Sequence, residues 1–137
     1  MILEQARDHG TSARALQSTV LVVDDDEHFR NLARQILELD DFDVIEAESV
    51  NQCLWLLGCH SVDAIVLDIL MPDRDGIEAL KDIKTTYSGM KVVTVSGARH
   101  SDVYLTTSTY LGADGSLAKS ELSTLCALLN TVLKRQS

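Results

Sequence analysis

Short apolar runs alternate with longer amphipathic stretches along most of the chain. The runs are rich in aliphatic residues, as expected of strands that are buried on both faces of a parallel sheet. Each run is followed by a polar stretch and then by a segment with helical spacing. The predicted strands lie at 19–23, 43–47, 63–67, 91–95 and 115–117.

Between these runs, apolar residues recur at three- and four-residue spacing, which predicts helices. Asp26 or a neighbouring acid is placed to cap the first helix, and Ser49 and Gln52 have the spacing of a capping box at the second. The fourth is the weakest, because its 106–109 run of threonine and serine has low helix propensity. The predicted helices lie at 27–38, 49–57, 76–85, 101–111 and 120–134.

Five successive strand–helix units predict the α/β class, with one doubly wound parallel sheet. A chain of 137 residues suits a single domain with a substantial core. The net charge of -9 argues against direct binding to DNA or to anionic membranes. No stretch is long and apolar enough to predict membrane insertion. Three cysteines without a framework spacing favour a reduced, cytoplasmic location.

Acidic residues stand where two of the predicted strands end. The first strand runs into Asp24, Asp25 and Asp26, and the third runs into Asp68. Open α/β sheets place their sites at the carboxyl ends of strands. If these strands are neighbours, the carboxylates converge, which is unfavourable unless a hard cation or protons neutralise them. Helix capping accounts for one of the three consecutive acids, but not for the convergence with Asp68.

Two further strand ends add a hydroxyl and an amine. The fourth strand runs into Ser96 and Gly97, and the short fifth strand runs into Lys119. Singly these signals are weak, because a serine before glycine is an ordinary turn and a lysine after a strand is usually solvated. The combination of acids, hydroxyl and lysine at four strand ends is specific.

The stretches VLVVDDDE, LDILMPDRDG, VSG and GADGSLAK occur in this order along the chain. Together they resemble the receiver domain of two-component response regulators, over about residues 19–135. The resemblance implies a flavodoxin-like fold, with strand order 2-1-3-4-5 and five helices. It leaves residues 1–18 as a flexible N-terminal extension and 19–137 as a receiver domain of the stand-alone type, without a DNA-binding output domain.

The resemblance also implies the chemistry of the acidic cluster. Asp68 is then the phosphorylation site, because a carboxylate can attack a phosphoryl group and form an acyl phosphate. Mg²⁺ would allow the anionic phosphoryl group to approach the acids. Asp25, Asp68 and the backbone carbonyl of Leu70 are the expected direct ligands of Mg²⁺, and Asp24 is expected to act through a metal-bound water.

Lys119 is expected to pair with Asp68 and then with the phosphoryl oxygens, and Ser96 to donate its hydroxyl to one of those oxygens. Two positions depart from the family pattern. Ser116 stands where the family usually has an aromatic switch residue, and Ser120 stands where it usually has proline after a cis peptide bond. Neither departure touches the acidic cluster.

The function that the resemblance implies is a phosphorylation-dependent switch. Its partners would be a sensor histidine kinase or a histidine phosphotransfer protein, and a downstream protein target that meets the face of helix four, strand five and helix five. Such a switch catalyses only its own phosphorylation and dephosphorylation, and it is not a metabolic enzyme. Two alternatives stay open: a degenerate receiver that serves only as an interaction module, and a small Mg²⁺-dependent aspartyl phosphatase.

Overall fold

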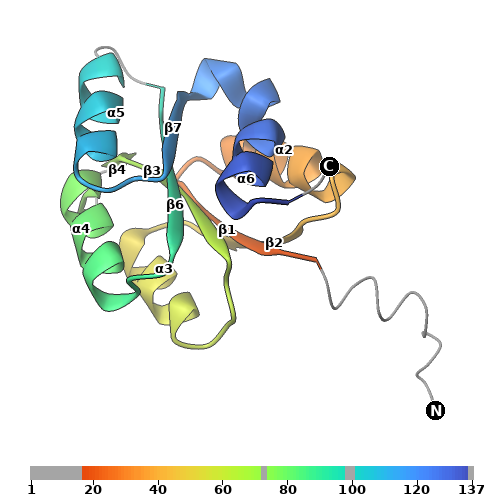
Figure 1. Ribbon diagram of the computed structural model, residues 1–137, viewed down its shortest axis with the longest axis horizontal. Coiled ribbons are helices and arrows are strands. Elements are labelled where there is room, and N and C mark those ends of the chain that lie inside the picture. Colours follow the sequence, from red (N-terminus) through yellow and green to blue (C-terminus); the bar gives the residue numbers. More distant parts are fainter. Residues whose placement is uncertain (1–16, 72–73, 98–100, 136–137) are drawn as a thin grey trace.

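A five-stranded parallel sheet forms the centre of the computed structural model, which describes residues 17–71, 74–97 and 101–135 (Figure 1). The strands are arranged β2-β1-β3-β6-β7. Ranked along the chain, this is the expected order 2-1-3-4-5, so the predicted fold class is confirmed. The strand bounds are β1 Thr19–Val23, β2 Asp43–Ala47, β3 Ala64–Asp68, β6 Lys91–Ser96 and β7 Gly115–Ala118.

Helices cover both faces of this sheet. The helices α2 and α6 lie on one face, and α3, α4 and α5 lie on the other (Figure 1). The bounds are α2 Glu27–Leu39, α3 Val50–Leu57, α4 Gly76–Thr86, α5 Ser101–Tyr110 and α6 Leu125–Leu133. The five helices predicted from periodicity are therefore confirmed.

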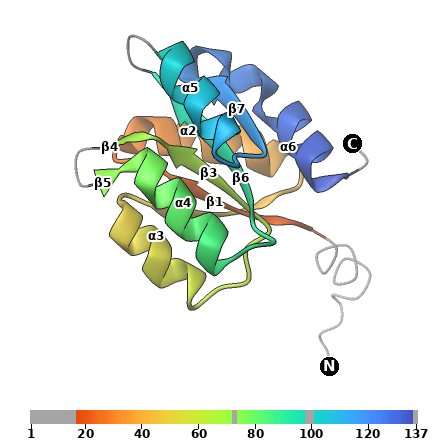
Figure 2. The same ribbon diagram turned by 60° about the vertical axis from the view of Figure 1, so that its left-hand side comes forward.

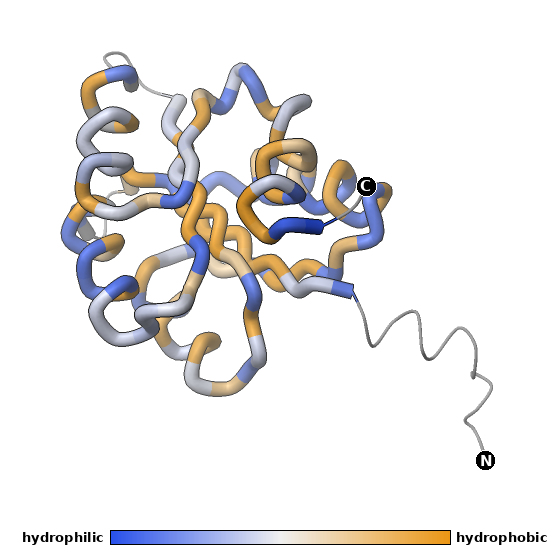
Figure 3. Tube along the Cα trace, viewed as in Figure 1, coloured by the Kyte–Doolittle hydropathy of each residue, from blue (hydrophilic) through white to orange (hydrophobic). Residues whose placement is uncertain are grey.

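The two hydrophobic cores follow from the alternation of side chains along each strand. In β1, Val20 and Val22 point into the core beneath α2 and α6, whereas Leu21 and Val23 point into the core beneath α3 and α4. The central strand β3 is buried along its whole length. Accordingly, the hydrophobic residues concentrate along the strands (Figure 3). Burial on both faces explains why these strands are continuous apolar runs rather than alternating ones.

Polar side chains define two of the helix starts. Asp26 caps α2, since its Oδ1 accepts a hydrogen bond from the backbone N of His28 at 2.9 Å. Ser49 caps α3 by accepting a hydrogen bond from the backbone N of Gln52 at 3.0 Å. The Gln52 side chain accepts a hydrogen bond from the backbone N of Glu48 at 2.7 Å, one residue before the cap. Both predicted caps are therefore present, with the capping box displaced by one residue.

Two segments differ from the sequence expectation. The helix predicted over 120–134 begins as a 3₁₀ helix, η1, at Lys119–Thr124, with non-helical dihedrals at Glu121. The spacing of the leucines predicts which face of the helix is apolar, but it does not distinguish a 3₁₀ turn from an α-helical turn. The loop after Asp68 contains a small antiparallel pair, β4 Leu70–Met71 and β5 Arg74–Asp75, which lies beside the start of α4 (Figure 2).

The extension predicted at 1–18 lies outside the described residues, except for residues 17 and 18. Within the described parts of the chain, no helix has the length and apolar character needed to cross a bilayer. Those same parts contain no cis peptide bond, so the peptide between Lys119 and Ser120 is trans.

Candidate functional site

Three carboxylates meet at the carboxyl edge of the sheet. Strands β1 and β3 are parallel neighbours, so Asp24 and Asp25 after β1 come close to Asp68 at the end of β3. One carboxylate oxygen from each lies within 4.8 Å of the others. Asp24 and Asp68 are buried, whereas Asp25 is exposed. The predicted convergence of the acids is confirmed.

The third consecutive acid, Asp26, has a different role. Its side chain caps α2, and its backbone N donates a hydrogen bond to Asp24 Oδ1 at 2.9 Å. The Asp26 side chain therefore points toward α2, while the Asp26 backbone N holds the Asp24 carboxylate in place. This division of roles follows from the start of α2, because the cap residue must face the first free backbone N–H groups.

Lys119 connects the ends of three strands. Its Nζ lies 2.6 Å from Asp24 Oδ2 and 3.2 Å from Asp68 Oδ2. The expected pairing with Asp68 is present, but the shorter contact is with Asp24. The ammonium also lies over the ring of Phe29, 4.6 Å from its centroid. A Cβ on Gly97 would lie 3.1 Å from Cδ of Lys119, so the absence of a side chain at Gly97 leaves space for the lysine stem.

Burial and the contacts between the charged groups shift two pKa values in the cluster. Burial raises the pKa of Asp24 to about 6, although the contact with Lys119 and the backbone N–H of Asp26 oppose this shift. Burial lowers the pKa of Lys119, but its contact with Asp24 and the charges of Asp68 and Asp24 outweigh burial and raise the pKa overall. The ammonium of Lys119 contacts two of the three converging carboxylates.

These residues fit a hard divalent cation. Asp24 Oδ2 is buried and, apart from its ion pair with Lys119, accepts no well-aligned hydrogen bond from the described residues. Carboxylate oxygens in such a cluster are the ligands that Mg²⁺ takes, and Mg²⁺ usually keeps several water molecules as well. The exposed position of Asp25 gives such water access to one side of the cluster.

Asp68 is held in a defined orientation at the end of β3. Its Oδ1 accepts a hydrogen bond from the backbone N of Leu70 at 3.0 Å, and its Oδ2 faces Lys119. A Cβ on Gly76 would overlap the backbone of Ile69, so only glycine allows the start of α4 to approach this strand end so closely. The Leu70 carbonyl as a metal ligand stays a prediction.

Ser96 lies at the same edge of the sheet as Asp68 and Lys119. It is the last residue of β6 and is fully buried. On one side, Val95 of β6 pairs with Asp68 of β3, and on the other, Ser96 pairs with Ala118, the residue before Lys119. The order of strands thus places the hydroxyl residue at the end of the strand between β3, which ends at Asp68, and β7, which precedes Lys119.

Two residues of the site carried no clear signal in the sequence. Phe29 has the spacing of a core residue of α2, which it is, but its ring also contacts Lys119. Arg30 donates a hydrogen bond from Nη1 to the backbone O of Asp24 at 2.7 Å. The one available hint was that Arg30 follows the cap of α2 by about one turn, which places its side chain near the acids.

This fold, with acids, hydroxyl and lysine at neighbouring strand ends, defines a class of signalling domain. Residues 20–130 match the response regulator receiver domain. The chain belongs to this family.

Two curated relatives illustrate the likeness. The chain is 34% identical over 117 residues to the transcriptional regulatory protein CpxR of Escherichia coli, covering 85% of this chain and 49% of CpxR. It is 36% identical over 101 residues to the chemotaxis protein CheY of Halobacterium salinarum, covering 73% of this chain and 82% of CheY. The chain therefore spans about half the length of CpxR and most of the length of CheY.

Solved structures agree with these relatives. The response regulator TrrA from Thermotoga maritima, in complex with Mg²⁺ and BeF, superposes with a TM-score of 0.75 at 25% sequence identity. The likeness covers 85% of this chain and 99% of TrrA.

Proposed function

We propose that this receiver domain is a phosphorylation-dependent switch that accepts a phosphoryl group on Asp68 from a phosphohistidine. The donor would be a sensor histidine kinase or a histidine phosphotransfer protein, and the output would be the control of a downstream protein target. The observation that carries the proposal is the convergence of Asp24, Asp25 and Asp68, with Lys119 in contact with two of them. The proposal describes a cytoplasmic signalling switch, not a metabolic enzyme.

The chemistry is a transfer between two nucleophiles. A carboxylate oxygen of Asp68 attacks phosphorus, the bond from phosphorus to the histidine nitrogen breaks, and that nitrogen keeps the electron pair. Asp24, Asp25 and Asp68 would hold Mg²⁺, which neutralises charge on the phosphoryl oxygens. The complex of TrrA with Mg²⁺ and BeF supports this choice of cation.

Two further residues have proposed roles in the transfer. Lys119 already contacts Asp68 Oδ2, so a small movement brings its ammonium to the phosphoryl oxygens, where it balances their charge. Ser96, on the strand next to Asp68, would donate its hydroxyl to a phosphoryl oxygen. The Leu70 carbonyl would complete the metal ligands.

The decisive experiment treats the protein with acetyl phosphate and Mg²⁺ and measures its intact mass. The wild type should gain one phosphoryl group and Asp68→Ala should gain none. Asp26→Asn is the matched control: it lies beside the cluster but caps α2, a role that asparagine also fills, so it should keep the adduct.

Other outcomes would point to other functions. An adduct that persists in Asp68→Ala would contradict the assignment of the nucleophile. A wild type that gains no adduct would favour a receiver that acts only as an interaction module. Turnover of external phosphate esters would favour an aspartyl phosphatase.

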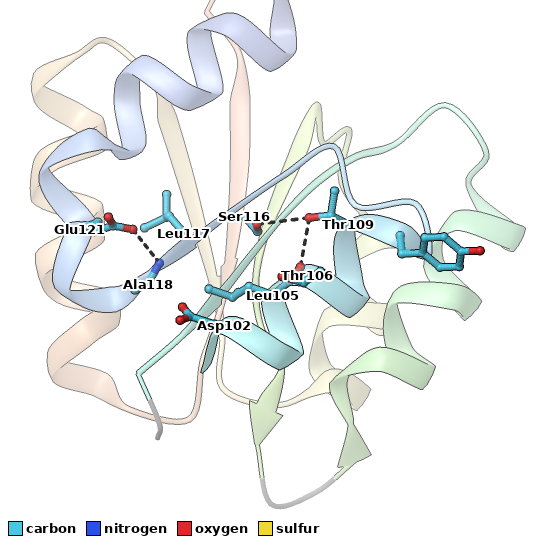
Figure 4. Close-up of a pocket in the computed structure, with 9 residues that line it drawn as sticks. Asp102, Leu105, Thr106, Thr109, Ser116, Leu117, Ala118 and Glu121 are labelled. Carbon is cyan, nitrogen blue, oxygen red and sulfur yellow. Dashed lines mark hydrogen bonds between the residues drawn. The ribbon is translucent and has the colours of Figure 1, made fainter. Parts of the chain in front are cut away.

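We further propose that the output face is formed by α5, β7 and η1. An open groove of about 530 Å³ lies there (Figure 4). Ser116 belongs to its lining and is too small to fill it, where the family usually has an aromatic residue. The other lining residues are Asp102, Leu105, Thr106, Thr109, Tyr110, Leu117, Ala118 and Glu121.

The charge of this groove favours a basic partner segment. Asp102 and Glu121 both belong to the lining of the groove, and Glu121 accepts a hydrogen bond from the backbone N of Ala118 at 3.3 Å (Figure 4). A docking segment with lysine or arginine side chains would face these two carboxylates. Binding of such a partner should then weaken with rising salt concentration, and Asp102→Asn should reduce that salt dependence.

Hydroxyl pairs attach α5 to the sheet. Thr94 of β6 and Ser108 of α5 have their oxygens 2.6 Å apart, and Thr109 and Ser116 have theirs 3.3 Å apart. Because the Thr109–Ser116 contact is exposed and the threonine-rich sequence has low helix propensity, a shift of α5 that keeps the buried Thr94–Ser108 pair should cost little. New acceptor oxygens near Ser96 would start this shift.

Amide hydrogen exchange with and without beryllium fluoride, a mimic of the phosphoryl group, tests the output face. Protection in α5 should change, and Ser96→Ala should reduce that change. Unchanged exchange in α5, with changes confined to α2 or α3, would mean that the signal leaves by another face.

A further inference from the structure

The guanidinium of Arg30 connects the acidic cluster to the outer strand of the sheet. Its Nη1 donates to the backbone O of Asp24 at 2.7 Å, and its Nε donates to Glu46 Oε1 on β2 at 3.0 Å. The Arg30 side chain is 12% exposed, so water competes little for these two bonds.

The direction of the Asp24 backbone carbonyl affects the position of Asp25. Asp24 is the first residue after β1, and its backbone N still donates to the O of Ala47 on β2 at 3.0 Å. Its carbonyl begins the peptide unit that leads to Asp25. Because a peptide unit is planar, fixing that carbonyl also fixes the direction in which the chain enters Asp25. Asp25 is exposed, so its position relies on its backbone more than on packing.

The guanidinium is itself held in position. Glu46 accepts from Arg30 with Oε1, and it accepts from Arg34 Nε with Oε2 at 2.6 Å. Arg34 also contacts Glu38 Oε2 at 2.9 Å. A planar guanidinium presents several N–H groups in a rigid fork, which a lysine ammonium does not. Arg30 can therefore bind Glu46 and the Asp24 carbonyl at once.

We propose that Arg30 is a positioning residue for the acidic cluster: by holding the Asp24 carbonyl, it keeps Asp25 directed toward Asp24 and Asp68. This inference rests on the metal site of the proposed function. It predicts that Arg30 aids the binding of a cation although Arg30 is itself a cation. A purely electrostatic influence has the opposite sign, because removing a nearby positive charge strengthens cation binding.

The test compares Arg30→Gln with Arg34→Gln. Both arginines lie on α2, one turn apart, and both pair with Glu46, but the hydrogen bond to the Asp24 carbonyl comes from Arg30. Each substitution removes one positive charge and one ion pair with Glu46. Titration with Mg²⁺ should show an affinity about tenfold weaker in Arg30→Gln, as is typical when a group that orients a ligand is lost. Arg34→Gln should bind Mg²⁺ as the wild type does or slightly more tightly.

A second readout needs no metal. Amide hydrogen exchange in metal-free protein should be faster at Asp25 and Asp26 in Arg30→Gln than in Arg34→Gln. Arg30→Lys keeps the charge but loses the fork, so it should behave like Arg30→Gln in both measurements. It also serves as the working variant should Arg30→Gln not fold.

The results separate the two proposals. If the wild type does not bind Mg²⁺, the proposed function fails, while the exchange measurement still decides the role of Arg30. If the wild type binds Mg²⁺ and the variants at Arg30 and Arg34 change affinity and exchange equally, the positioning role is wrong. Tighter Mg²⁺ binding by Arg30→Gln would assign the arginine an electrostatic role instead.

Discussion

A buried pair of hydroxyls offers a quantitative test of how α5 is attached to the sheet. Thr94 Oγ1 and Ser108 Oγ lie 2.6 Å apart, and both residues are 0% exposed. Ser108 Oγ also donates to the backbone O of Leu105 at 2.8 Å. A hydroxyl has a single hydrogen, and that of Ser108 is used on Leu105. Thr94 must therefore be the donor to Ser108.

This polarity predicts unequal costs for the two single substitutions. Ser108→Ala leaves the Thr94 hydroxyl as a buried donor that has lost its acceptor, which costs about 1–3 kcal/mol of unfolding free energy. Thr94→Val keeps the side-chain shape and leaves Ser108 bonded to Leu105, so the cost is the net value of one hydrogen bond, about 0.5–1.5 kcal/mol. The double variant leaves no buried donor without an acceptor, so its loss of unfolding free energy should be less than the sum of the losses in the two single variants.

Urea unfolding of the four proteins measures these free energies in one double-mutant cycle. Ser116→Ala is a suitable control, because it removes a hydroxyl from the longer, exposed contact with Thr109 and should cost less than about 0.5 kcal/mol. A larger cost for Thr94→Val than for Ser108→Ala would show that the donor is assigned in the wrong direction. Strictly additive costs would show that the pair does not act as a unit.

Three further predictions concern the site and its surroundings. Asp25→Asn should weaken Mg²⁺ binding more than Asp26→Asn, because Asp25 belongs to the converging carboxylates and Asp26 caps α2; equal effects in a metal titration would contradict this. The acyl phosphate should be long-lived, because the Leu70 side chain beside Asp68 cannot hydrogen-bond an attacking water, so Leu70→Asn should speed its decay. An unchanged decay rate would refute that explanation. Burial acts to raise the pKa of Glu46, but hydrogen bonds from two arginines outweigh burial and lower it. The ionised Glu46 side chain therefore contributes fully to stability above its ordinary pKa of 4.5, and this contribution is lost as the pH falls through the lowered value. In urea unfolding, the stability difference between the wild type and Glu46→Gln should therefore shrink in acid; a difference that stays constant would reject this reasoning.

Most of the fold could be predicted because its signals are local. A central strand such as β3 is buried on both faces and must be apolar throughout, and a covering helix such as α2 must be apolar along one face. Both requirements are visible in the sequence, the first as short apolar runs and the second as apolar residues at helical spacing. The 3₁₀ start of the last helix left no such mark, because the dihedrals at Glu121 depend on the turn around it rather than on periodicity.

The composition of the site was also determined by the sequence. Acids, a hydroxyl and a lysine at successive strand ends must share one edge once the sheet is parallel, since all of its strands end on the same side. The convergence of Asp24, Asp25 and Asp68 also needs β1 and β3 to be neighbours, which the strand order implied by the family resemblance supplied. The same strand order places Ser96 on the strand between β3, which ends at Asp68, and β7, which precedes Lys119.

Only the tertiary structure decided how these residues are connected. Lys119 lies closer to Asp24 than to Asp68, and its ammonium lies over the Phe29 ring. Arg30 reaches the Asp24 carbonyl while Glu46, on another strand, holds its guanidinium. Apart from the local bond from Arg30 to the Asp24 carbonyl, these contacts join elements that are separate in the chain. Their distances depend on how α2 and the last strand pack on the sheet, and residue spacing along a sequence carries no record of that packing.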